Sequence, residues 1–215
     1  MPTPHAAILY HVHDPMCSWC WGFRRAWDQL RKVLPESLKV VNIVGGLAAD
    51  TDEPMPAEQQ KTIAGYWSDV SAQTGAQFNF DFWKICQPRR STYPACRAVL
   101  AATNQQAEQA MIDAIQEAYY LRAMNPSDNS TLITLAGEMG LDTTRFSADL
   151  SSPATQTELE KNFSLRRKLG VSSFPSLVLA QGETFVPIAV DYRDYHTSLD
   201  AINHAMGTNV AGPGI

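Results

Sequence analysis

The sequence is short of charge and has no long apolar segment. Charged residues make up 18% of its 215 residues and hydrophobic residues 45%. A chain of this composition can bury a sizeable core, which excludes global disorder. No apolar run reaches the roughly 18 residues of a membrane-spanning helix, so we expect no membrane span. The net charge of −5 argues against nucleic acid as a partner.

The first five residues lack lysine and arginine, and no apolar stretch of signal-peptide length follows them. A secretory signal has both features, so we expect a cytoplasmic protein. Cysteine is also scarce, with four in the chain. In a reducing compartment, four cysteines indicate catalysis or redox sensing more than a disulfide framework.

Two of the cysteines, Cys17 and Cys20, are separated by only two residues. They follow an extended apolar run and precede apolar residues at helical spacing. This order of strand, turn and helix puts Cys17 at a helix N-terminus, where unpaired N–H groups and the helix dipole favour the thiolate. Cys20 lies one helical turn later on the same side. It can therefore resolve a mixed disulfide formed on Cys17, as dithiol–disulfide exchange requires.

A zinc site and an inert cysteine pair are the alternatives. A structural zinc site usually takes four ligands, often from two closely spaced pairs. The other cysteines, Cys86 and Cys96, have nine residues between them and no histidine close by. We therefore predict no metal site. These two cysteines are either small buried side chains or a second relay near Cys17.

Three ionisable residues immediately precede the cysteines. His11 and His13 share one face of the predicted strand, and either could tune the pKa of Cys17, with His13 the nearer in sequence. The commoner alternative is a histidine bound to a backbone partner. Asp14 would raise a cysteine pKa or relay a proton, or it would shape the turn before the next proline.

The next part of the chain predicts a parallel βαβ unit followed by helices. Residues 6–13 form its first strand, a helix follows from about residue 20 to 34, and residues 38–44 form a second strand, apolar enough to be central in a sheet. From residue 57 to about 149 almost every pattern is helical, including a long helix at 105–124.

Strands return near the C-terminus. A helix at 155–169 ends in a basic cluster that we interpret as a solvated, capping face, formed by Arg166, Arg167 and Lys168. Strands at 176–180 and 184–190 then form a hairpin, and Pro187 predicts that the second lies at a sheet edge. A helix at 194–206 follows, and we expect residues 210–215 to be loose.

Three segments in this order resemble the DsbA family of thioredoxin-like proteins, in the group of predicted protein-disulfide isomerases. They are residues 14–23, which contain Cys-x-x-Cys, residues 95–99 and residues 173–175. The resemblance implies an α/β thioredoxin fold with an all-helical insertion between its βαβ and ββα halves. The thioredoxin-like domain is then discontinuous, at residues 1–50 and 154–215, and the helical insertion occupies residues 51–153.

The resemblance also implies roles for individual residues. Cys17 is the exposed nucleophile and Cys20 the buried resolving cysteine. Pro175 is the cis-proline that faces both. The backbone of Phe174 can then pair with an extended substrate, and the side chains of Trp19, Trp21 and Phe174 can form an apolar rim around it. Core packing is the alternative for all three and the favoured one for Trp21.

The implied activity is that of a thiol–disulfide oxidoreductase or protein-disulfide isomerase acting on protein or peptide thiols and disulfides. It needs no metal or organic cofactor, and glutathione is a candidate redox partner. Ser18 and Trp19 stand where periplasmic oxidants of the family carry Pro-His, which argues against strong oxidase activity. Two alternatives are a glutathione-dependent transferase or isomerase of the kappa-class type, whose reactive position is typically serine, and a non-catalytic redox sensor.

Overall fold

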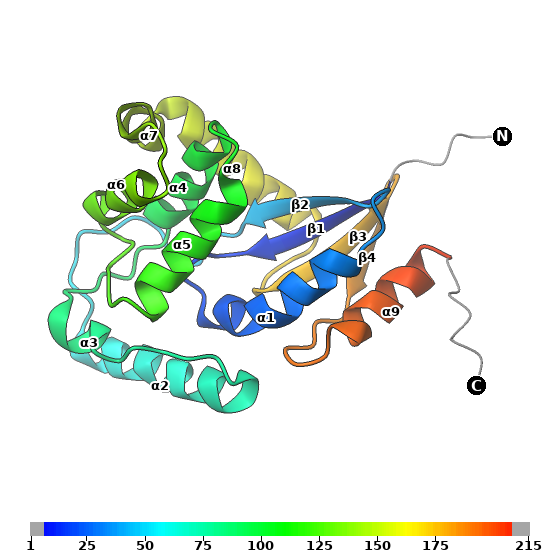
Figure 1. Ribbon diagram of the computed structural model, residues 1–215, viewed down its shortest axis with the longest axis horizontal. Helices are drawn as coiled ribbons and strands as arrows, with labels where there is room; N and C mark the ends of the chain where they lie inside the picture. Colours follow the sequence, from blue (N-terminus) through cyan, green and yellow to red (C-terminus); the bar gives the residue numbers. More distant parts are fainter. Residues whose placement is uncertain (1–6, 208–215) are drawn as a thin grey trace.

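The computed structural model describes residues 7–207, so the expected loose tail at 210–215 lies outside the described residues. A βαβ unit and a ββα unit enclose a long run of helices (Figure 1). The elements are β1 (Ile8–His13), α1 (Ser18–Val33), β2 (Lys39–Val44), α2 (Ala57–Thr74), α3 (Phe82–Ile85), α4 (Tyr93–Thr103), α5 (Glu108–Tyr120), α6 (Asn129–Glu138), α7 (Thr143–Leu150), α8 (Pro153–Lys168), β3 (Ser176–Gln181), β4 (Thr184–Ile188) and α9 (Tyr195–Ala205).

The four strands form one mixed sheet in the order β2-β1-β3-β4. β1 is parallel to β2 and antiparallel to β3, and β3 is antiparallel to β4. β4 lies at an edge, as Pro187 predicts, because proline cannot donate to a second neighbour. β2 also lies at an edge, so the prediction of a central strand is wrong. Its apolar side chains are buried by helices instead: Ile43 packs with Leu165 of α8, and Val44 belongs to the core of the helical block.

Alternation along the strands separates two cores on opposite faces of the sheet. On one face, Leu9 packs with Trp27 of α1 and Ile202 of α9. On the other, Val12 packs with Leu169 at the end of α8. Figure 1 shows α1 and α9 together on one side of the sheet and α8 on the other. The same alternation places His11 and His13 beneath α1, on the face of Leu9.

Helices α2 to α7 form a block next to the carboxyl ends of β1 and β2 (Figure 1). Its centre is Trp67, which is 1% exposed. The ring of Trp67 contacts six other aromatic rings, those of Phe78, Phe80, Phe82, Trp83, Tyr119 and Tyr120. Met16, from the turn before α1, belongs to the same core. The block therefore packs directly against the turn that carries the cysteines.

Two details of the block differ from the sequence prediction. Helix α5 is shorter than the predicted 105–124, because Gln106 and Ala123 adopt positive φ angles of 60° and 51°, which an α-helix cannot contain. Helix α3 is not predicted from the sequence, because four residues are too few to show helical periodicity. Within residues 7–207, no helix combines the length and apolarity that crossing a membrane requires.

Candidate active site

Cys17 is the N-cap residue of α1, as the sequence predicts. Its backbone is extended, with φ −86° and ψ 118°, and its carbonyl accepts the N–H of Trp21 at 3.1 Å. Its own N–H donates to the carbonyl of Asp14 at 3.0 Å, which closes the turn between β1 and α1. Cys20 lies in the first turn of α1, and both side chains are free thiols.

The two thiols differ in access rather than in total exposure. Cys17 is 6% exposed and Cys20 4%, so the prediction of an exposed Cys17 is wrong for the side chain as a whole. Cys17 nevertheless lines a cavity of about 330 Å³, and Cys20 does not. The cavity is also lined by Met16, Ser18, Trp19, Leu47, Ile63, Tyr66, Trp67, Arg90, Ser172, Ser173 and Phe174. Leu47 and Tyr66 are exposed, so the cavity reaches the surface beside Cys17.

The environment shifts the pKa values of the two thiols in opposite directions. A hydrogen bond from the Cys20 thiol lowers the pKa of Cys17, as do the backbone N–H groups of Cys20 and Trp19, against the opposing effects of burial and the Asp14 charge. Burial, followed by the interaction with Cys17, raises the pKa of Cys20 well above its usual range. Cys17 is therefore the thiol that ionises first, and Cys20 holds its proton.

The Phe174–Pro175 peptide bond is cis and lies beside Cys17. The Cys17 thiol donates to the carbonyl oxygen of Phe174, with 3.6 Å between the two atoms. Strand pairing brings these distant segments together, because Ser176 of β3 pairs with Val12 of β1. The backbone before β3 thus borders the reactive sulfur.

The predicted apolar rim has two members in the cavity wall, Trp19 and Phe174. The ring of Trp19 lies 5.3 Å from that of Tyr192. Trp21 points elsewhere: its ring stacks on Tyr120 at 5.5 Å, and its indole N–H donates to Gln77 at 2.9 Å. Trp21 therefore packs in the structure, and Trp19 remains available to a substrate.

Phe174 is held in place by Arg166 and Gly45. The guanidinium of Arg166 lies 5.8 Å from the rings of both Phe163 and Phe174, and it donates to the carbonyl of Gly45 at 2.6 Å. A Cβ at Gly45 would collide with the Phe174 ring in its present position, so a larger residue there would displace the ring. The interpretation as a solvated basic face is wrong for Arg166, whose half-buried guanidinium lies over both rings. Arg167 and Lys168 are exposed in the last turn of α8, as predicted.

Asp14 is fully buried and joins three segments of the chain. Its carboxylate accepts hydrogen bonds from the N–H groups of Met16 and Leu47, at 2.8 and 2.7 Å, and from the hydroxyl of Thr92 at 2.7 Å. Burial raises the pKa of Asp14, and these hydrogen bonds oppose the rise. These hydrogen bonds agree with the prediction that Asp14 shapes the turn. The charge of Asp14 also acts to raise the pKa of Cys17, which agrees with the other predicted role.

The two histidines are buried and stacked, with ring centroids 4.8 Å apart. His11 Nδ1 is 3.1 Å from Oδ1 of Asn42, and neither ring nitrogen of His13 has a hydrogen-bond partner in the described part of the chain. The expected backbone partner is therefore absent for both rings within residues 7–207. Burial lowers the pKa of His11 to about 4 and that of His13 well below its usual range. Both rings are neutral at pH 7, so neither adds charge beside Cys17 at that pH.

The remaining cysteines, Cys86 and Cys96, are free thiols with different hydrogen-bond partners. The thiol of Cys96 is buried and donates to the Asp14 carboxylate at 3.6 Å, and burial raises its pKa well above the usual range. The thiol of Cys86 donates to the carbonyl of Ala123 at 3.1 Å. Cys96 thus contacts the active-site turn through Asp14, and Cys86 does not. No group of three or more metal-ligating side chains comes together in residues 7–207.

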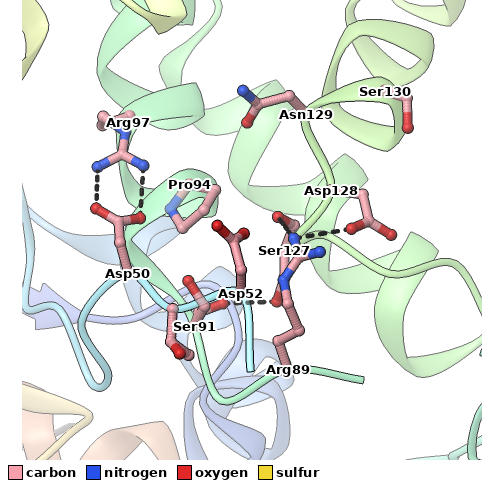
Figure 2. A pocket seen from close by; sticks show the side chains of 11 residues that line it. Asp50, Asp52, Arg89, Ser91, Pro94, Arg97, Ser127, Asp128, Asn129 and Ser130 are labelled. Atoms are coloured by element: carbon pink, nitrogen blue, oxygen red, sulfur yellow. Dashed lines mark hydrogen bonds and ion pairs between the residues drawn. The ribbon is translucent and has the colours of Figure 1, made fainter. Parts of the chain in front are cut away.

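A second, polar cleft of about 520 Å³ lies in the helical block (Figure 2). Its two arginines are paired: Arg97 with Asp50 at 2.7 Å, and Arg89 with Asp128 at 2.8 Å. Figure 2 shows both pairs in the wall of the cleft. Asp52 also lines the cleft and makes no ion pair within residues 7–207, so two arginines face three carboxylates there and the cleft carries an excess of one negative charge.

Sequence analysis missed several residues around the cysteines, among them Leu47, Arg90 and Thr92. Thr92 stands where a helix N-cap is expected, but its hydroxyl binds Asp14 and makes no cap hydrogen bond. A threonine before Tyr-Pro indicates the start of a helix, and no local pattern indicates the distant carboxylate. Arg90 and Leu47 reach the site only through the fold.

Comparison with known proteins agrees with this geometry. The family model described as thioredoxin matches residues 10–190. The ClpXP adapter protein SpxH of Bacillus subtilis (strain 168) is 24% identical over 172 residues, which are 79% of this chain and 56% of that protein. The chain thus spans little more than half the length of this curated relative.

Solved structures match over nearly their whole length. A candidate protein disulfide isomerase from Nitrosomonas europaea is 27% identical with a TM-score of 0.82, over 94% of this chain and 98% of that one. The cytosolic disulfide reductase DsbM from Pseudomonas aeruginosa is 21% identical with a TM-score of 0.76, over 95% and 100%. Its structure with GSH is 22% identical with a TM-score of 0.73, over 94% and 98%. Family model, fold and Cys-x-x-Cys turn agree with the resemblance found in the sequence: the chain belongs to the thioredoxin family, with the DsbA-like form of its fold.

Proposed function

We propose that this protein is a thiol–disulfide oxidoreductase that uses Cys17 and Cys20 as its redox couple. The observation that carries the proposal is the inequality of the two thiols. Cys17 lines the cavity and has a lowered pKa, whereas Cys20 lies outside the cavity and has a raised one. A nucleophile and a protected resolving thiol need this difference.

In the reducing direction, the Cys17 thiolate attacks a substrate disulfide. One substrate sulfur leaves as a thiolate, and the other stays bound to Cys17 as a mixed disulfide. Cys20 then loses its proton and attacks the Cys17 sulfur, which releases the second substrate thiol. The dithiol gives up two electrons and becomes the Cys17–Cys20 disulfide, and the substrate disulfide becomes two thiols. In the oxidising direction the same steps run in reverse, and the Cys17–Cys20 disulfide passes to the substrate. Isomerisation stops at the mixed disulfide, where another substrate thiol attacks the bound substrate sulfur and displaces Cys17 as a thiolate, with no net transfer of electrons.

The Phe174 carbonyl borders the reactive sulfur at 3.6 Å, and Trp19 and Phe174 wall the cavity. We assign these residues and Pro175 to substrate binding, where an extended chain pairs with exposed backbone and packs on apolar side chains. Peptide or protein disulfides fit this arrangement.

Glutathione is the redox partner that we propose, and the cytoplasm the compartment. The relative from Pseudomonas aeruginosa supports both, since it is named a cytosolic reductase and has a structure with GSH. No metal or organic cofactor enters the steps above. The glutathione pool of the cytoplasm would keep Cys17 and Cys20 in the dithiol form, so the protein would act chiefly as a reductase.

The curated relative named as a ClpXP adapter supports a second candidate, a redox-dependent binding protein without turnover. Such a protein would also form a Cys17–Cys20 disulfide. The kappa-class alternative would transfer glutathione and would not need Cys20.

A thiol count over a single turnover separates the dithiol mechanism from glutathione transfer, and repeated turnover with excess substrate disulfide and reduced glutathione separates the enzyme from the binding protein. Reduced protein is mixed with one equivalent of glutathione disulfide or of a disulfide-bonded peptide, quenched with an alkylating agent and mapped by mass spectrometry. We expect two substrate thiols per protein and the loss of alkylation at Cys17 and Cys20, with Cys86 and Cys96 still alkylated after denaturation. Substrate thiols released without loss of alkylation at Cys17 and Cys20 would exclude the dithiol mechanism.

A further inference from the structure

Arg90 is a half-buried arginine in the wall of the Cys17 cavity. Its guanidinium makes no ion pair or hydrogen bond with any other residue that the structure describes. The half-buried arginines elsewhere do have such partners: Arg89 binds Asp128, Arg97 binds Asp50 and Arg24 binds Glu117. A cation that is partly removed from water normally has a partner, because the charge loses hydration. Arg90 is therefore a donor without an acceptor.

The other residues that line this cavity are all uncharged. Among the residues that the structure describes, Arg90 is thus the one permanently charged side chain that lines the space a substrate must enter to reach Cys17. The protein as a whole carries a net charge of −5, which repels anionic substrates at long range. A local cation in this otherwise uncharged cavity offsets that repulsion within the space that Cys17 also lines.

We propose that Arg90 binds a carboxylate of the substrate and so makes the protein selective for anionic disulfides. This inference rests on the proposed function. The planar guanidinium matches a carboxylate with two parallel hydrogen bonds, and a charged hydrogen bond of this kind is stronger than a neutral one. A volume of about 330 Å³ is at the small end for ligand pockets, so the carboxylate and the sulfur must lie within a few residues of each other. Glutathione disulfide and peptides with an acidic residue beside the cysteine both have this chemistry.

The test uses three small disulfides that differ in charge: dithiodipropionate, hydroxyethyl disulfide and cystamine. Stopped-flow measurements give the second-order rate constant of the reduced protein with each, divided by that of dithiothreitol with the same disulfide. Each reaction takes two electrons from the Cys17–Cys20 dithiol and yields two small thiols. The decisive quantity is the ratio of the anionic to the neutral rate constant.

We expect the ratio to favour the anionic disulfide in the natural protein and to fall about tenfold in Arg90→Gln, as befits the loss of one charged hydrogen-bonding partner. Arg90→Lys should retain part of the preference, because charge remains without the fork geometry. Arg89→Gln is the matched control: this neighbour lines the polar cleft instead, and its variant should keep the ratio. Added salt should lower the ratio in the natural protein more than in Arg90→Gln.

An unchanged ratio in Arg90→Gln overturns the inference, including the case in which all three reactions slow by one common factor. The proposed function fails separately, if the natural protein reacts with none of the three disulfides. Glutathione disulfide and an acidic peptide disulfide, each paired with a neutral analogue, then identify the source of the carboxylate. If Arg90→Gln removes the preference for glutathione disulfide over its neutral analogue, the carboxylate is that of glutathione. If it removes the preference for the acidic peptide disulfide, the carboxylate is that of a polypeptide.

Discussion

Replacing Cys20 with serine should trap the protein as a mixed disulfide with its substrate, at close to one adduct per chain. The serine hydroxyl cannot attack the Cys17 sulfur, so the reaction stops after its first step. Serine can still donate a hydrogen bond to Cys17, which is the largest contribution to the lowered Cys17 pKa. Intact mass spectrometry after mixing with a peptide disulfide measures the adduct.

Two variants make this result specific. Cys17→Ser should form no adduct and show only the uncatalysed exchange rate, because the nucleophile is gone. Cys20→Ala should form the same adduct more slowly at neutral pH, since alanine donates no hydrogen bond and the pKa of Cys17 rises. The pH dependence of Cys17 alkylation reports that pKa in each variant. Exchange by Cys17→Ser at the natural rate would overturn the assignment of roles.

The second large effect is on stability in acid. Burial lowers the pKa of His11 from 6.5 to about 4, and that of His13 falls well below its usual value. Below pH 6.5 the unfolded chain therefore binds protons that the folded chain does not, and the free energy of unfolding falls as the pH falls. For His11 alone, the loss between pH 7 and pH 5 is roughly 2 kcal/mol. His13 adds to it.

The variant His13→Leu should flatten this pH dependence. Leucine is similar in size and apolar, and His13 makes no hydrogen bond within residues 7–207 that the change would break. We expect the variant to be at least as stable at pH 7 and more stable than the natural protein at pH 5. Urea unfolding followed by tryptophan fluorescence, repeated from pH 7 to pH 5, gives both free energies.

His204→Leu is the matched control, because His204 is exposed on α9 and its ring makes no hydrogen bond or ion pair within residues 7–207. It should keep the full pH dependence. Asp14 works in the opposite direction, since burial raises its pKa and its protonation in acid favours the folded state. Asp14 is present in every variant compared, so a difference between their pH profiles of unfolding free energy reports the substituted histidine alone. Parallel pH profiles for the natural protein and His13→Leu would contradict this account.

The local part of the site could be predicted from the sequence. The alternation of β1 puts His11 and His13 on one face, and the apolar spacing that begins at Phe23 fixes α1 immediately after the cysteines. These patterns repeat within a few residues and need no knowledge of the fold. They suffice to place Cys17 at the N-terminus of a helix, with Cys20 inside its first turn.

The partners of these residues could not be predicted, because they come from distant segments. Asp14 binds Thr92, 78 positions later, and Cys17 contacts Phe174, 157 positions later. Arg166 looked like a helix-capping cation, since sequence alone does not show that Gly45 leaves room for the Phe174 ring beneath it. Similarly, the apolar residues of β2 indicate that helices or strands cover its faces, but they do not show whether it pairs with one strand or with two.

The central claim is that Cys17 and Cys20 form a reversible redox couple. The direct test equilibrates the purified protein in a series of glutathione buffers and counts alkylated cysteines by mass spectrometry, with peptide mapping to locate them. We predict a two-electron transition in which Cys17 and Cys20 lose alkylation together, with a midpoint in the range of roughly −270 to −120 mV that thioredoxin-like proteins span. Cys86 and Cys96 should stay alkylated throughout. A protein in which Cys17 and Cys20 remain separate thiols, or carry only glutathione adducts across the whole series, would contradict the account.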